Sequence, residues 1–162
     1  MTSPGYVALM LAHALCALIG FGALGTTGAY AQAVTKSENP YTSEALQRFF
    51  RPGHNLASAM IGLVPLLGAG LLFAQHGKDA HLLYPWIGLV LWIAAAGIAT
   101  GLIWPAEHKL QLLLASRRAI SPHAPSVVER GELAVLARQC LLGATLTTAC
   151  FLAAFVVMIA QP

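Results

Sequence analysis

The chain has 162 residues, of which 57% are hydrophobic and 9% are charged, and its mean hydropathy is +0.70. About a quarter of a soluble domain is charged, so this composition excludes an ordinary soluble domain and predicts lipid around most of the surface. The net charge of +3 comes from nine Lys and Arg. These bases flank apolar runs and do not alternate with aromatic residues, which argues against nucleic acid and favours anionic lipid headgroups as partners.

Four long segments lack any Asp, Glu, Lys or Arg: residues 1–35, 52–77, 80–106 and 139–162. Each segment holds the roughly 20 apolar residues with which a helix crosses the hydrocarbon. The segments are rich in Leu and Ala and lack strict alternation, which favours helices over barrel strands. We therefore predict an all-α, polytopic four-helix bundle that forms one transmembrane domain over 1–162. The expected spans are about 6–31, 55–75, 83–104 and 139–160.

The first span resembles a signal peptide only at "AYA", residues 29–31, a small-x-small sequence. The N-terminal "MTSPGY" has no basic residue, and the apolar stretch far exceeds the 7–15 residues of a signal-peptide core. We therefore expect a retained span.

The basic residues predict the orientation. Eight of the nine lie in the connections between spans 1 and 2 and between spans 3 and 4, or at their edges, and the connection between spans 2 and 3 holds only Lys78. Since basic loops stay in the cytoplasm, both termini are expected on the periplasmic or extracellular side of a bacterial inner membrane.

The first cytoplasmic connection, "NPYTSEALQRFF" at 39–50, is typical of a short interfacial helix. Thr42 or Ser43 is expected to cap it, and Phe49 and Phe50 are expected to reach toward lipid.

The second connection predicts a helical hairpin that projects into the cytoplasm. "SVVE", 126–129, forms a capping box for a helix that continues into span 4. Span 3 is expected to continue past Pro105 through "HKLQLLLASRRA".

Small residues are expected to bring the helices together within the bundle. Gly97 and Gly101 form a GxxxG pair, and four further glycines crowd the second half of span 1: Gly20, Gly22, Gly25 and Gly28. Pro65 is expected to kink span 2. Cys16, Cys140 and Cys150 have no metal-ligand spacing and an odd count, so we interpret them as packing residues and predict no metal site.

His13 is the most informative polar residue, because it lies about 10 Å inside the first span at the rise of a helix. A neutral imidazole at that depth can ligate haem iron or relay a proton, and it can equally make a hydrogen bond between helices. Met10 and Met158 are candidate second ligands. His54 lies at the opposite face, and His76 and His81 belong to the outer turn between spans 2 and 3.

A second candidate site lies at the cytoplasmic ends of spans 2 and 3, where an anionic ligand, a metal or a quinone headgroup could bind. Its residues are Arg51, His54, Glu107, His108 and Lys109. The alternative is structural: Pro52 and Gly53 turn the chain, and His54 or Asn55 caps the next helix.

The tryptophans fit membrane anchoring, with Trp86 at the outer and Trp104 at the inner interface. Trp92 lies deeper and is expected to pack against the core or lipid, or against a planar cofactor. The spans lack acidic and basic residues, which argues against a proton-driven transporter, and no nucleophile–histidine spacing indicates an enzyme.

Three stretches carry a family resemblance: "LAHALCALIGFGAL", "LVLWIAAAGIATGLIWPAEHKL" and "FVVMIAQP". They resemble small four-helix integral membrane proteins grouped as a domain of unknown function. More distantly, the chain is similar to bacterial four-helix membrane protoporphyrinogen oxidases and copper-resistance membrane proteins. The resemblance to the oxidases implies that His13 binds haem b. The oxidases' lysine early in the third helix has no counterpart in "YPWIGLV", 84–90.

These observations predict a non-catalytic accessory, assembly or stabilising subunit of a larger membrane complex, such as a respiratory one. Its partners would be the bilayer and other membrane subunits, or further copies of the chain. A haem b redox protein that uses His13 is the first alternative, and quinone or headgroup binding is the second.

Overall fold

The computed structural model of the chain describes residues 3–52, 55–74, 81–120 and 123–160. Every regular element in these ranges is helical, which confirms the all-α prediction. Four helices in the described part are long and apolar enough to cross a membrane: Pro4–Lys36, Ala57–Ala74, Leu83–Arg117 and Val127–Ile159. Each contains or overlaps one of the predicted spans, so the chain has the architecture of a multi-pass membrane protein. The side on which the termini lie stays a prediction.

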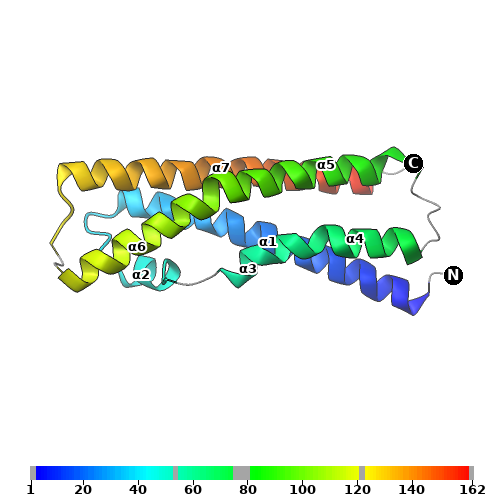
Figure 1. Cartoon of the computed structure of the whole chain (residues 1–162), viewed down its shortest axis with the longest axis horizontal. Coiled ribbons are helices and arrows are strands. Elements are labelled where there is room, and N and C mark those ends of the chain that lie inside the picture. Colours follow the sequence, from blue (N-terminus) through cyan, green and yellow to red (C-terminus); the bar gives the residue numbers. More distant parts are fainter. Residues whose placement is uncertain (1–2, 53–54, 75–80, 121–122, 161–162) are drawn as a thin grey trace. The chain divides into compact units, whose positions relative to one another are not determined.

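Figure 1 shows the elements in chain order. Two long helices, α1 (Pro4–Lys36) and α7 (Val127–Ile159), are continuous. The second span is composite, with α3 (Leu56–Ala59), the 3₁₀ turn η1 (Met60–Gly62) and α4 (Leu63–Ala74). The third joins α5 (Leu83–Ile98), the π-helical segment η2 (Ala99–Ile103) and α6 (Trp104–Ile120), and the short helix α2 covers Glu44–Phe49.

The chain divides into two compact units. Unit 1 comprises residues 1–23, 55–97 and 147–162, and unit 2 comprises residues 24–54 and 98–146. Both α1 and α7 contribute to each unit. The single domain expected over 1–162 stays a prediction.

In unit 1, α1 approaches the 3₁₀ turn at Gly20. A Cβ on Gly20 would lie 2.7 Å from the backbone nitrogen of Ile61, so only glycine fits there. One residue later, Phe21 stacks on Phe151 of α7 with ring centroids 5.0 Å apart. The close approach predicted for this glycine of the first span is therefore confirmed, and it is made with the second span.

The second span changes helix type just before Pro65. Proline has no N–H to donate to the carbonyl four residues earlier, which here belongs to Ile61. The chain forms the 3₁₀ turn η1 over Met60–Gly62 and then resumes as α4. The indole Nε1 of Trp92, from α5, donates to the Ile61 carbonyl at 2.8 Å. The helix type thus changes next to Pro65, where the sequence predicts a kink, and α5 uses the backbone acceptor at this point.

Unit 2 has a core that includes α2 and the segment before it. Phe50 is 1% exposed and belongs to the same apolar cluster as Leu110 and Leu114 of α6. Phe49 packs on this cluster and stacks on Tyr30 of α1 at 3.9 Å. The expectation that Phe50 reaches toward lipid is therefore wrong, because its ring fills the space between α2 and α6.

Two polar contacts fix α2 in unit 2. The side-chain amide of Gln47 donates to the carbonyls of Tyr41 and Leu114, each at 3.2 Å. Ser43 is the N-cap residue of α2, although its side chain makes no capping bond. The predicted short helix is therefore confirmed, but the side chain of Ser43 does not cap it.

Close helix contacts in unit 2 depend on two further glycines. A Cβ on Gly28 of α1 would lie 2.5 Å from the Cβ of Ala144 in α7. A Cβ on Gly143 would lie 2.5 Å from Cγ1 of Ile103 in η2. Both contacts place helix backbones against small partners, as expected in lipid, where packing rather than hydrophobicity draws helices together.

The third helix continues beyond its apolar part, as predicted. The π-helical segment η2 immediately precedes Trp104 and Pro105, and α6 then extends to Ile120. Since Pro105 cannot donate to the preceding turn, a wider turn before it accommodates the missing bond.

Candidate functional site

His13 lies in unit 1 on α1, where it faces α4. The ring is half-buried, and a Cβ on Gly68 would lie 3.3 Å from its Cε1 and 3.6 Å from its Nδ1. The imidazole therefore occupies the space that Gly68 leaves open. The Nδ1 atom is enclosed and has no partner within hydrogen-bond geometry in the described chain, although the backbone of Val64 lies beside the ring.

The packing on Gly68 covers one edge of the ring, the edge that carries Cε1 and Nδ1. Of the candidate second ligands, Met10 is 45% exposed, and the methyl group of Met158 would lie 3.1 Å from a Cβ on Gly88 of α5. Haem binding by His13 stays a prediction.

The described residues of the site predicted at the cytoplasmic ends of the second and third helices differ in exposure. In unit 2, Arg51 is exposed, and so are His108 and Lys109 on α6. Glu107, their neighbour, is only 4% exposed and belongs to the interior. His54 and His76 lie outside the described residues, and His81 is exposed. Headgroup binding by the exposed members stays a prediction.

The structure supports the alternative to ligand binding in which His54 or Asn55 caps the helix of the second span. Asn55 is the N-cap residue of α3, and its side-chain oxygen accepts from the N–H of Ser58 at 3.3 Å. The Ser58 hydroxyl donates back to the Asn55 carbonyl at 2.9 Å. The Asn55 side chain therefore supplies a hydrogen-bond acceptor for a backbone N–H in the first turn of the helix.

Buried polar atoms gather around Glu107. The Nε2 of Gln111, one turn later, donates to its Oε1 at 3.5 Å. The thiol of Cys140 in α7 donates to the Ile103 carbonyl at 3.9 Å, one turn before Glu107. Cys140 and Glu107 are also close enough to interact electrostatically. The sequence does not predict this polar group inside the apolar core of unit 2, because it places Glu107 with His108 and Lys109 at a possible ligand site.

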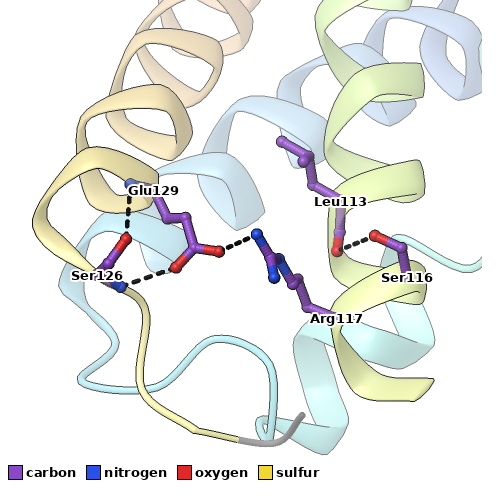
Figure 2. A network of polar contacts seen from close by, with 5 residues as sticks. All are labelled: Leu113, Ser116, Arg117, Ser126 and Glu129. Atoms are coloured by element: carbon purple, nitrogen blue, oxygen red, sulfur yellow. Dashed lines mark hydrogen bonds and ion pairs between the residues drawn. The ribbon is translucent and has the colours of Figure 1, made fainter. Parts of the chain in front are cut away.

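The hairpin between α6 and α7 is closed by polar contacts (Figure 2). The backbone N–H of Ser126 donates to Oε2 of Glu129 at 2.8 Å, and the N–H of Glu129 donates to the Ser126 hydroxyl at 3.4 Å, which confirms the predicted capping box. The same carboxylate forms an ion pair with Arg117 at the end of α6. Arg130 also donates to the Glu38 carbonyl at 2.9 Å. These contacts join both connections of unit 2.

One exposed face of α5 in unit 1 contains an open glycine position. The face consists of Val90, Ile93, Ala94 and Gly97, which are all exposed and lie at helical spacing. A Cβ on Gly97 would meet no atom within 4 Å, and the same holds for Gly101 in η2. The expectation that this GxxxG pair brings the chain's own helices together is therefore wrong. We call the four residues the open face of α5.

No family model, curated protein or solved structure matches this chain. The resemblance to four-helix membrane proteins of unknown function therefore stays a prediction.

Proposed function

We propose that this multi-pass protein is a non-catalytic accessory or assembly subunit of a larger membrane complex, and that a partner helix packs on the open face of α5. Glycine inside a helix costs about 1 kcal/mol relative to alanine. Gly20, Gly28 and Gly68 offset this cost through close contacts within the chain. At Gly97 the space that a Cβ would occupy is open, and the close approach of another polypeptide is the role that we propose for it.

The neighbours of Gly97 support this assignment. Residues three or four positions away lie on the same face of an α-helix, and Ala94 of α5, three positions before Gly97, is small and exposed. Gly22 of α1 is also open, but two large exposed residues, Leu18 and Ile19, stand one turn before it, whereas one, Ile93, stands one turn before Gly97. Small residues allow the backbones of two helices to approach closely, and dispersion contacts then stabilise the helix pair.

Gentle solubilisation followed by native mass measurement tests this proposal. We expect the protein to co-purify in a fixed ratio with another membrane subunit, and Gly97→Ile to abolish this association. Gly131→Ile is the matched control, because Gly131 is also helical and open but lies among the exposed valines of the first turns of α7. A wild-type protein that stays alone, or equal loss in both variants, would contradict the proposal.

We also propose that both termini face the periplasm of a bacterial inner membrane. The support is the concentration of eight of nine basic residues in the two other connections or at their edges. Tags at both ends should be cleaved by protease added to intact spheroplasts. Tags that the protease does not cleave would show that the termini face the cytoplasm and would contradict this orientation.

A haem b redox protein that uses His13 is the first alternative. The proposed subunit function predicts a colourless detergent preparation. A Soret band that disappears in His13→Ala would overturn this expectation and favour a haem-linked redox function.

Headgroup binding is favoured by the exposure of Arg51, His108 and Lys109 in unit 2. Anionic lipid is the ligand we propose for them, since each base near a charged surface contributes about 1 kcal/mol. Loss of co-purified anionic lipid from Arg51→Gln and Lys109→Gln is the expected result. Co-purified quinone that is lost in these variants, with no loss of lipid, would favour quinone as the ligand.

A further inference from the structure

A short basic segment of unit 2 carries two charges that the described part of the chain does not neutralise. Arg48 belongs to α2, Arg51 follows three residues later, and both side chains are exposed. Neither forms an ion pair with a residue that the structure describes. By contrast, Arg117 pairs with Glu129, and Arg130 donates to two backbone carbonyls. The two arginines of this segment are therefore available to an anion from outside the chain.

The aromatic residue between the two arginines places the segment beside α1. The ring of Phe49 stacks on that of Tyr30, with ring centroids 3.9 Å apart and an angle of 6° between the planes. Lys36, at the end of α1, is the first charged residue of that helix. Tyr30 precedes it by about 9 Å at the rise of a helix, toward the apolar part of α1. The segment therefore lies where the chain passes from the hydrocarbon to the lipid headgroups.

Two contacts on the other side of the segment hold it in place on α6. The side-chain amide of Gln47 donates to the Leu114 carbonyl at 3.2 Å. Phe50 is 1% exposed and belongs to the same apolar cluster as Leu110 and Leu114. The backbone that carries both arginines is thus fixed before any ligand binds, which reduces the entropy that binding costs.

An anionic phospholipid matches the chemistry of this surface. Guanidinium groups bind phosphate oxygens through paired N–H donors. Tyr30 is 37% exposed, and a tyrosine at the membrane interface presents an apolar ring to lipid and a hydroxyl group to the headgroups. Glu44 is exposed one turn before Arg48 and reduces the local positive charge without cancelling it. A free phosphate would use the arginines and leave the aromatic pair without a role.

We propose that Arg48, Arg51 and the stacked pair of Tyr30 and Phe49 form a binding site for one anionic phospholipid. The lipid phosphate binds the two guanidinium groups, and the glycerol and the first acyl carbons pack on the exposed part of Tyr30. This site rests on the headgroup binding proposed above, and it adds Arg48 and the aromatic pair to Arg51.

Native mass spectrometry of the purified chain in detergent, with phosphatidylglycerol added, tests the site. The wild-type protein should bind one phosphatidylglycerol more tightly than phosphatidylcholine. Arg48→Gln and Arg51→Gln should each weaken phosphatidylglycerol binding about fivefold and leave phosphatidylcholine binding unchanged. Lys36→Gln is the matched control, because it removes an exposed charge from the end of α1, away from the aromatic pair. Equal weakening in Lys36→Gln would show diffuse attraction only and would contradict the site.

The aromatic pair and the source of the phosphate are tested separately. Tyr30→Ala should weaken phosphatidylglycerol binding, whereas Tyr30→Phe, which keeps the stacked ring, should retain most of it. Unchanged binding in folded Tyr30→Ala would remove the aromatic pair from the site and contradict the proposal. Inorganic phosphate should not displace the lipid at equal concentration. Displacement would assign the arginines to a free anion and would also contradict the proposal.

Lys109→Gln distinguishes this site from the headgroup binding on which it rests. Loss of phosphatidylglycerol in Lys109→Gln, with none in Arg48→Gln, would contradict the site beside α2 and leave headgroup binding at α6 supported. A wild-type protein that binds the two lipids equally would contradict both proposals.

Discussion

Trp92 donates its indole N–H to the carbonyl of Ile61, the acceptor that Pro65 leaves without its helical donor. The 2.8 Å bond joins α5 to the second span of unit 1. Close to this point, Gly20 of α1 meets the backbone of Ile61. A proline, a glycine and a tryptophan on three helices therefore define one junction.

The hydrogen bond of Trp92 can be measured by a double-mutant cycle. Trp92→Phe removes the donor and keeps most of the ring, so we expect a loss of about 1 kcal/mol in unfolding free energy. Pro65→Ala restores an N–H for the Ile61 carbonyl, so Trp92→Phe should cost less in that background. Equal costs in both backgrounds, from denaturant unfolding in detergent, would show that Pro65 does not create this acceptor.

Gly28 should be intolerant of any side chain. Its missing Cβ would lie 2.5 Å from that of Ala144, and overpacking costs about 1–3 kcal/mol. We expect Gly28→Ala to lower the unfolding free energy, although alanine favours helix. Ala144→Gly should rescue it. Gly22→Ala, where no atom lies within 4 Å, is the control and should be neutral or stabilising.

The capping box should contribute measurably to unit 2. Ser126→Ala removes a hydroxyl that accepts from the first turn of α7, and such changes cost about 1 kcal/mol. Ser116→Ala is the matched control, because its hydroxyl bonds only to the Leu113 carbonyl of its own helix, where no cap is formed (Figure 2). Equal unfolding free energies for the two variants would argue against a capping role.

Tyr41 should make unit 2 sensitive to alkaline pH. Burial raises the pKa of the Tyr41 phenol above its ordinary value, and the charges of Glu129 and Glu132 act in the same direction while Arg117 opposes them. The folded state therefore favours the neutral phenol. Stability is fully present below about pH 10, the ordinary value, and is lost as the pH rises toward the folded value.

Unfolding measured on either side of that range tests the phenol of Tyr41. Tyr41→Phe should remove part of the alkaline loss of stability, and a late-titrating phenolate absorbance should disappear with it. An unchanged alkaline profile in Tyr41→Phe would assign the loss of stability to other groups.

The helix positions could largely be predicted, because the long apolar segments are uncharged and because turn and capping residues mark their ends. The capping box at Ser126 and the cap at Asn55 depend on contacts within three residues, so local sequence contains them. The continuation past Pro105 was predicted for the same reason.

The inward faces were not predictable, and the reason is physical. In lipid, exposed residues are as apolar as buried ones, so periodicity does not distinguish Phe50 from an anchor in the membrane interface. Glu107 looked like part of a basic cluster because it precedes His108 and Lys109, yet one helical step of 100° separates inside from outside. Likewise, Gly28 and Gly97 both lie in apolar helical segments, and the sequence does not distinguish them. Only the structure shows that Ala144 of α7 fills the space beside Gly28.

Photo-crosslinking from the open face of α5 in native membranes tests the proposed subunit function most directly. With a photo-reactive amino acid in place of Gly97, we predict an adduct with one other membrane polypeptide, and no such adduct when the same group replaces Gly131. Adducts with lipid alone, with a second copy alone, or of equal yield from both positions would contradict the assignment of this face to a partner subunit.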